Sequence, residues 1–456
     1  MQTMTVKEII DAAGGKLISG DINTEIKGIT TNSRETKAGF MFIPLIGDKF
    51  DGHDFINAAF DLGAAAVLTH KETEPLIDKT IVKVEDTHKA LGDIARYYKA
   101  KHNLPTVAVT GSVGKTTTKD MLHSVLSEKY NTLKTQGNFN NDIGLPLTVF
   151  NIEKENEAAV LEMGMNHFGE IEYLVSIAKP DVAVITNIGQ SHIQNLGSRE
   201  GIFKAKMEIT NLFTKDNTLI VNGDDDFLSK AKGMGEYKVV YYGIKNPEND
   251  VYAKDIENNG LDGIRFTAVV DGIEYKTEVT VPGEHNVYNA LAAICVGREF
   301  GVPTDGIIAG IKNFKPTKMR MAVEDFEGIK IINDCYNASP DSIKSSLGVL
   351  GGVDNMRRVA VLGDVFEMGD FAAQAHYSLG AVVAENNIDL LITAGENMKH
   401  LARGAMDNGV KNVISFDKTL EVCSYVKTEI KSGDAVLIKA SRGMHFEEVY
   451  NAITEK

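Results

Sequence analysis

Short apolar runs and amphipathic stretches alternate along most of the chain. The runs "AAAVLTH", "TVAVTG", "DVAVITN" and "TLIVN" are rich in β-branched and small apolar residues, which predicts buried strands. Between them, "THKALGDIARYYKAKHN", "GEIEYLVSIAK" and "FKAKMEITNLF" place apolar residues three and four positions apart, which predicts helices. Alternation of strand and helix predicts parallel sheets joined by crossover helices, and therefore an α/β fold.

The pattern changes at three places, and these changes predict domain boundaries. A new strand begins after Pro105, and residues 251–281 carry strands without helices, with Asp271-Gly272 as a hairpin turn. The polar stretch "KPTKMR" predicts a linker, after which "RRVAVLGD", "LLITAG", "NVISF" and "AVLIKAS" form a second α/β series. We predict an N-terminal domain (1–103), a central domain with a parallel sheet and an antiparallel appendage (104–315), and a C-terminal Rossmann-like α/β domain (316–456). A chain of 456 residues is long enough for this division.

Composition narrows the possible partners and the cell compartment. A net charge of -15 argues against a nucleic-acid backbone as main partner, because phosphate neutralisation needs concentrated Lys and Arg. Cys295, Cys335 and Cys423 are far apart and odd in number, as expected of free thiols in a reducing compartment. We expect no signal peptide and no membrane-spanning segment, because "MQTMTVKEII" lacks a basic region followed by an apolar run and no apolar run approaches about 20 residues. We expect a cytoplasmic protein that is not inserted in a membrane, and we expect a monomer.

The segment "VAVTGSVGKTTTKDM" predicts a phosphate-binding loop. A strand, a Gly-containing turn and a helix start bring backbone N–H groups and the positive end of a helix together, which favours anions. Lys115 can neutralise the β- and γ-phosphates of a nucleotide, and the Thr116 hydroxyl can bind Mg2+. Val109 stands where the usual loop has its first glycine, so this loop is a variant. The predicted nucleotide-binding residues here are Gly111, Ser112, Val113, Gly114, Lys115, Thr116 and Thr117.

The loop does not define the reaction by itself. A GTPase should carry an N-K-x-D tetrapeptide for guanine, and the sequence has none. An ATPase module would place an acidic residue at the end of an apolar strand, and Glu162 in "AVLEMG" does so, where it can hold Mg2+. A P-loop ATPase or regulatory module therefore remains one alternative.

An ordered series of motifs resembles the Mur ligases, the ATP-dependent amide ligases of peptidoglycan precursor synthesis. The similar segments are "TGSVGKTTTK", "GNFNNDIGLPLT", "LEMGMNHFGEI", "ITNIGQSHIQNLGS", "FKAKMEI", "GEHNVYNALAA", "INDCYNASPDS" and "KASRGM", which span essentially the whole chain. Three segments, "NNDIGLPLT", "YNASPDS" and "GDVFEMG", are most similar to the members that add D-alanyl-D-alanine to UDP-MurNAc-tripeptide. The D-N-P-R tetrapeptide of the member that adds diaminopimelate is absent.

The N-terminal segment "TTNSRETKAGFMFIPLIGDKFDGHDFI" is similar to the family's uridine-diphosphate-binding segment. Asn32 stands where the family more often has Asp, which affects a detail of this contact. The resemblance implies Ser33, Arg34 and Asp48 at the UDP-sugar end. Folylpolyglutamate synthase shares the ATP-binding core, but this segment argues against it. Another amide ligase of the same core remains a second alternative.

The resemblance also implies ATP and Mg2+ as cofactors and an acyl-phosphate mechanism. It implies Lys115, Glu162, His192 and Lys206 as catalytic residues, with Thr116, Glu162, His192 and Lys206 near metal and Lys206 as a carbamate. It implies Asn286, Asn289, Arg320 and Asp334 on the nucleotide. Asn138, Asn140, Asn141, Asn337 and Ser339 are expected on the substrates, although Ser339 before Pro340 is also a plain helix N-cap.

Overall fold

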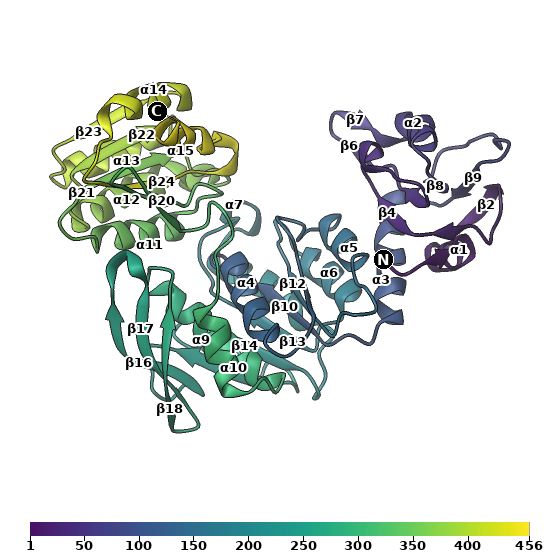
Figure 1. Ribbon diagram of the computed structural model, residues 1–456, viewed down its shortest axis with the longest axis horizontal. Coiled ribbons are helices and arrows are strands. Elements are labelled where there is room, and N and C mark those ends of the chain that lie inside the picture. Colours follow the sequence, from purple (N-terminus) through teal and green to yellow (C-terminus); the bar gives the residue numbers. More distant parts are fainter. Residues whose placement is uncertain (456) are drawn as a thin grey trace.

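The computed structural model describes residues 1–455 and contains three α/β units in succession along the chain. The central unit lies between the N-terminal and C-terminal units, which are on opposite sides of it (Figure 1). The three-domain α/β class predicted from the sequence is therefore confirmed. The positions of the boundaries, after residues 103 and 315, stay predictions.

The central unit is built on a nine-stranded sheet. Its strands, in spatial order, are β11 (Thr132–Lys134), β12 (Ala158–Glu162), β10 (Thr106–Thr110), β13 (Val182–Ile185), β14 (Thr218–Asn222), β15 (Lys238–Gly243), β16 (Val251–Asn258), β17 (Ile264–Val270) and β18 (Ile273–Val279). All pairs from β11 to β16 are parallel, whereas β16, β17 and β18 are antiparallel. The predicted appendage and its turn at Asp271-Gly272 are thus present.

Both faces of this sheet are buried, which explains why its strands are apolar throughout rather than alternating. Val107 and Val109 of β10 belong to one core, and Ala108 between them belongs to another. Helices α4 (Lys115–Leu126), α9 (His285–Glu299) and α10 (Thr304–Lys312) contribute to the first core. Helices α5 (Gly144–Val149), α6 (Glu170–Ala178), α7 (Ile193–Leu196) and α8 (Arg199–Met207) contribute to the second.

The C-terminal unit has a six-stranded sheet that differs in one respect from the sequence prediction. Its order is β19 (Ala322–Phe326), β20 (Ile329–Asn333), β24 (Asp434–Lys439), β21 (Arg357–Gly363), β22 (Leu390–Ala394) and β23 (Val413–Phe416). The β19–β20 hairpin was not predicted, because two of the five residues of "AVEDF" are charged and exposed at the sheet edge. The associated helices are α11 (Pro340–Gly351), α12 (Ala372–Glu385), α13 (Met398–Asp407), α14 (Thr419–Glu429) and α15 (Glu447–Thr454).

The N-terminal unit carries a five-stranded sheet and joins the central unit through a helix. The strand order is β2 (Lys16–Ser19), β9 (Thr80–Lys83), β8 (Ala66–Thr69), β5 (Phe40–Phe42) and β4 (Gly28–Thr30), with helices α1 (Val6–Ala13), α2 (Ile56–Asp61) and α3 (Thr87–Lys101). The Tyr98 hydroxyl of α3 donates to the Ile152 carbonyl of the central unit at 2.7 Å. Within residues 1–455, every helix is too short or too polar to cross a bilayer.

Close packing of α10 on α4 depends on a glycine. A Cβ placed on Gly310 would lie 2.6 Å from the Cα of Val125. We expect Gly310→Ala to lower the free energy of unfolding by about 1–3 kcal/mol, because the two backbones must move apart. Gly348→Ala on α11 is the matched control, since a Cβ there meets nothing within 4 Å. Thermal unfolding of both variants tests this, and equal midpoints would contradict it.

Candidate functional site

The phosphate loop lies at the carboxyl end of β10, between β12 and β13. Gly111 has φ 151° and Gly114 has φ 86°, values that residues with a side chain rarely adopt. A Cβ on Gly111 would also overlap the Thr186 hydroxyl, which donates to the Val113 carbonyl at 2.6 Å. The loop can therefore pass this close to β13 only because position 111 is glycine.

The loop places a lysine and a threonine opposite a buried carboxylate. The Lys115 ammonium donates to the Gly111 carbonyl at 2.8 Å, and burial lowers its pKa while the charge of Glu162 opposes this. Oε1 of Glu162 accepts from Thr116 Oγ1 at 3.3 Å and from Asn140 Nδ2 at 2.8 Å. Oε2 of Glu162 is buried without a hydrogen-bond partner in the part of the chain that the structure describes.

These oxygens suit a magnesium ion that is bound together with a nucleotide. Among residues 1–455, no group of three His, Cys, Asp or Glu side chains could hold a metal on its own. Mg2+ in phosphate sites is bound by one or two carboxylates, phosphate oxygens and water. The unpartnered oxygen of Glu162 beside the Thr116 hydroxyl fits that requirement.

His192 lines the cleft, whereas Lys206 is buried near Lys115. His192 adopts a left-handed backbone (φ 63°), and its Nδ1 is 2.8 Å from Oε2 of Glu367 in the C-terminal unit. This pairing lowers the pKa of Glu367. Lys206 on α8 is only 2% exposed, and burial, with repulsion from Lys115, brings its pKa well below the usual lysine value. Lys204, two residues earlier, is exposed and pairs with Glu200.

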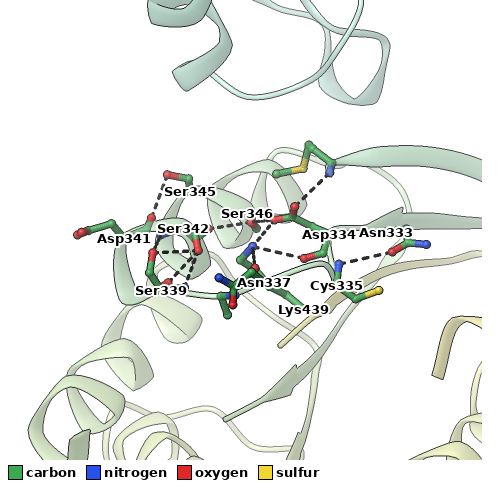
Figure 2. Close-up of polar contacts among 12 residues, drawn as sticks. Asn333, Asp334, Cys335, Asn337, Ser339, Asp341, Ser342, Ser345, Ser346 and Lys439 are labelled. Carbon is green, nitrogen blue, oxygen red and sulfur yellow. Dashed lines mark hydrogen bonds and ion pairs between the residues drawn. The ribbon is translucent and has the colours of Figure 1, made fainter. Parts of the chain in front are cut away.

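The C-terminal unit supplies the opposite wall of the cleft, and Asp334 is the centre of its polar network (Figure 2). Oδ1 of Asp334 accepts from the Met321 amide at 3.1 Å, and Oδ2 accepts from Ser346 at 2.7 Å and Lys439 at 2.5 Å. Lys439 also donates to the carbonyl of Asn337 at 3.1 Å. Burial lowers the pKa of Lys439, while Asp334 opposes this shift.

This network holds the turn between β20 and α11. Asn333 and Ile438 are register partners on the adjacent parallel strands β20 and β24. Asp334 and Lys439, the next residues along each strand, therefore meet at the carboxyl end of these strands. Ser339 caps α11, since its Oγ accepts from the Ser342 amide at 3.3 Å with Pro340 in the first turn. The plain N-cap interpretation of Ser339 is therefore confirmed.

One cleft brings together most of the residues predicted as site residues. They are Ser112, Val113, Gly114, Lys115, Thr116, Thr117, Asn138, Asn140, Asn141, Glu162, His192, Arg320, Asp334, Asn337 and Ser339. Gly111 belongs to the loop but not to the cleft lining, and Lys206 is buried near Lys115. The cleft lining also includes residues to which no role was given, namely His285, Glu367, Lys439 and Arg442. "GEHNVYNALAA", "GDVFEMG" and "KASRGM" contain these residues, but spacing alone could not show which side chains turn inward.

Besides Gly111 and Lys206, five further predicted residues do not line the cleft. Asn286 and Asn289 on α9 are buried, and their amides form a hydrogen-bonded chain from Thr118 Oγ1 through Asn289 Oδ1 (2.9 Å) to Asn286 (2.9 Å). Ser33, Arg34 and Asp48 are in the N-terminal unit. The first two form a short 3-10 helix, Ser33–Glu35, capped by Asn32, and Asp48 is exposed at a hairpin tip.

Fold and cleft define a three-domain α/β protein that binds a nucleotide at a phosphate loop facing its C-terminal domain. Comparison with known families gives the Mur ligase family catalytic domain over residues 25–99, the Mur ligase middle domain over 109–297 and the Mur ligase glutamate ligase domain over 319–442. The chain belongs to the Mur ligase family, so the resemblance noted in the sequence is confirmed.

Individual relatives match over nearly the full length. The UDP-N-acetylmuramoyl-tripeptide–D-alanyl-D-alanine ligase of Bacillus subtilis (strain 168) is 40% identical over 456 residues, covering 99% of this chain and 98% of its own. A crystal structure of MurF from Acinetobacter baumannii has TM-score 0.92 and 32% identity, covering all of both chains. MurF ligase from Thermotoga maritima, solved with ADP, has TM-score 0.83 and 29% identity over 94% of this chain and 97% of its own.

The buried Lys439–Asp334 ion pair leads to a prediction about the free energy of unfolding. Lys439→Met should lower the free energy of unfolding by about 3–5 kcal/mol, because it leaves the Asp334 carboxylate with an unpaired buried charge. Lys330→Met removes a partner of the exposed Lys330–Asp325 pair in the same unit and should cost about 1 kcal/mol or less. Urea unfolding of both variants measures the difference, and equal losses would contradict the prediction.

Proposed function

We propose that this protein is an ATP-dependent amide ligase that joins D-alanyl-D-alanine to UDP-N-acetylmuramoyl-tripeptide for peptidoglycan synthesis. The main observation that supports this proposal is that one cleft combines a phosphate loop and the Glu162 carboxylate with Arg320, Asp334 and Asn337 from a second domain. The full-length relatives that carry this activity in their names support the choice of substrates. A nucleotide bound at the phosphate loop would therefore contact residues of both domains.

The chemistry explains why a phosphate loop serves amide formation. A carboxylate oxygen is a poor leaving group, so the acceptor carboxylate first attacks the γ-phosphorus of ATP and ADP departs. The resulting acyl phosphate is attacked by the dipeptide amine, and the tetrahedral intermediate collapses to the amide and inorganic phosphate. Because the steps need little covalent help, the protein acts mainly by positioning groups and stabilising charge.

We assign the following roles to the central-domain residues. Lys115 and the amides of the 111–117 loop hold the phosphates. Thr116 and Glu162 hold Mg2+, which when bound neutralises charge developing on the phosphate oxygens. His192 would be a ligand for a second metal ion, and its contact with the Glu367 carboxylate would then have to break. Lys206 carries a carbamate, because burial and the charge of Lys115 lower its pKa and so favour the neutral amine that reacts with CO2.

The other assignments concern the two ends of the substrates. Arg320 binds the triphosphate and Asp334 binds the ribose. Asn289 lies on the adenine side of the nucleotide, and Asn286 holds it there through the hydrogen bond between the two buried side chains. Asn138, Asn140, Asn141, Asn337 and Ser339 surround the reacting groups. Ser33, Arg34 and Asp48 bind the UDP end, with the guanidinium of Arg34 on the diphosphate. We further propose a cytoplasmic monomer with the three domains given above.

Omission of single reactants tests the activity. The protein is incubated with ATP, Mg2+, UDP-MurNAc-tripeptide and D-Ala-D-Ala, each left out in turn, and products are weighed by mass spectrometry. We expect a pentapeptide product, with ADP release that needs both the acceptor and the dipeptide. ADP formed without the dipeptide would indicate an uncoupled ATPase, and a product with another amine would indicate a different amide ligase.

A labelled carbamate tests the role of Lys206. With 13C-bicarbonate, the wild-type protein should give a carbamate carbon resonance that Lys206→Ala lacks and that Lys204→Ala retains. Lys206→Ala should lose at least about 100-fold in kcat, as expected when a charged active-site group is removed, and short carboxylates should restore part of it. Full activity of Lys206→Ala without added carboxylate, or no resonance in the wild type, would exclude the carbamate.

A further inference from the structure

The linker between the central and C-terminal domains is held to the phosphate-loop helix by one side chain. Oδ2 of Asp120, on α4, accepts from the Thr317 hydroxyl at 2.5 Å. Oδ1 of Asp120 accepts from Lys134 Nζ at 2.8 Å, so the carboxylate is fixed from the opposite side. Asp120 is 3% exposed, whereas Thr317 is exposed apart from this contact. The central domain therefore holds the linker as far as Thr317.

The linker is held by the C-terminal domain from Met319 onward. The Tyr336 amide donates to the Met319 carbonyl at 3.2 Å, and the Met321 amide donates to Asp334 at 3.1 Å. The Arg320 guanidinium stacks on the Tyr336 ring, 4.2 Å from its centroid. Residues 319–321 are thus attached to the C-terminal domain. Lys318 is left between the two sets of contacts, spanned by a backbone hydrogen bond from Arg320 to Thr317 (3.1 Å).

Asp120 is also connected to the metal side of the phosphate site. Its neighbour Lys119 is 2% exposed and donates to the Thr135 carbonyl at 2.9 Å. The Lys119 ammonium is 3.4 Å from Oδ1 of Asp120 and 3.8 Å from Oε2 of Glu162, the oxygen without a hydrogen-bond partner. One buried ammonium therefore lies between the carboxylate that holds the linker and the carboxylate that faces the phosphate loop.

We propose that Asp120 is a positioning residue that pins Thr317 to the phosphate-loop helix, so that the C-terminal domain turns about Lys318 and carries Arg320 to the phosphate loop along one path. This inference rests on the proposed ligase function. Hinges are a few residues at the ends of elements that take up the change in backbone angles, and Lys318 is between two fixed points. Loss of the pin would leave each binding site intact but allow the domains to meet in unproductive orientations.

Thr317→Val tests the pin, because it removes the hydroxyl from an exposed residue without leaving a cavity. We expect kcat to fall about tenfold, the order expected for one hydrogen bond to a carboxylate, with KM for UDP-MurNAc-tripeptide within about twofold. Amide hydrogen exchange over residues 317–321 should rise while exchange in α4 is unchanged. Thr317→Ser should restore both values. Thr428→Val is the matched control, since the Thr428 hydroxyl donates only to the Tyr425 carbonyl of its own helix.

A wild-type value for kcat, for hydrogen exchange or for both in Thr317→Val would overturn the inference. Wild-type kcat with faster exchange would mean that the contact orders the linker without positioning the domain. A lower kcat with wild-type exchange would mean that Thr317 acts directly on a substrate. If the wild type forms no pentapeptide, the proposed function fails, and exchange in Thr317→Val still decides whether the pin exists.

Discussion

Everything at this site depends on how closely the backbone after β10 can approach the neighbouring strand. Gly111 lies against Thr186 with no room for a side chain, and from there the chain turns through Gly114 into α4. That path sets Lys115 and Thr116 at the start of the helix, opposite Glu162 at the end of β12. If the loop stood further out, the helix end, the lysine and the carboxylate could not act on one phosphate group.

Buried charges in the cleft follow from this arrangement. Two ammonium groups, Lys115 and Lys206, repel each other across the site, and burial lowers the pKa of both. Such a grouping is unfavourable without bound anions, so phosphate or a carbamate would relieve it. In the C-terminal domain, Lys439 and Asp334 neutralise each other and keep the turn that faces the loop in place. We therefore regard the two lysines as groups that bind anions, and the Lys439–Asp334 pair as support for the turn from which Asp334 would reach the ribose.

Sequence patterns predicted much of this molecule, for identifiable physical reasons. Strands buried on both faces, such as β10 and β13, are apolar throughout, and the helices between them have clear apolar faces. The glycine loop also has a strong local signature. The β19–β20 hairpin was missed, because an edge strand such as "AVEDF" needs no such pattern.

Contacts between distant segments could not be predicted. Lys439 and Asp334 are 105 positions apart and meet only because β20 and β24 are neighbours in the sheet. The same holds for His192 and Glu367, and for Asp120 and Thr317. The sequence motifs identified the segments that form the cleft. Only the three-dimensional arrangement shows that the side chains of Asn286 and Asn289 are hydrogen-bonded to each other and that Lys439 faces the cleft.

The central claim is that the cleft forms an acyl phosphate, and an oxygen label tests it most directly. UDP-MurNAc-tripeptide labelled with 18O at both oxygens of its reacting carboxylate is converted in the presence of ATP, Mg2+ and D-Ala-D-Ala, and the inorganic phosphate is analysed by mass spectrometry. Our account predicts one 18O atom transferred to each phosphate released, because the carboxylate oxygen leaves with the phosphorus. Phosphate without 18O, formed alongside the pentapeptide, would contradict it.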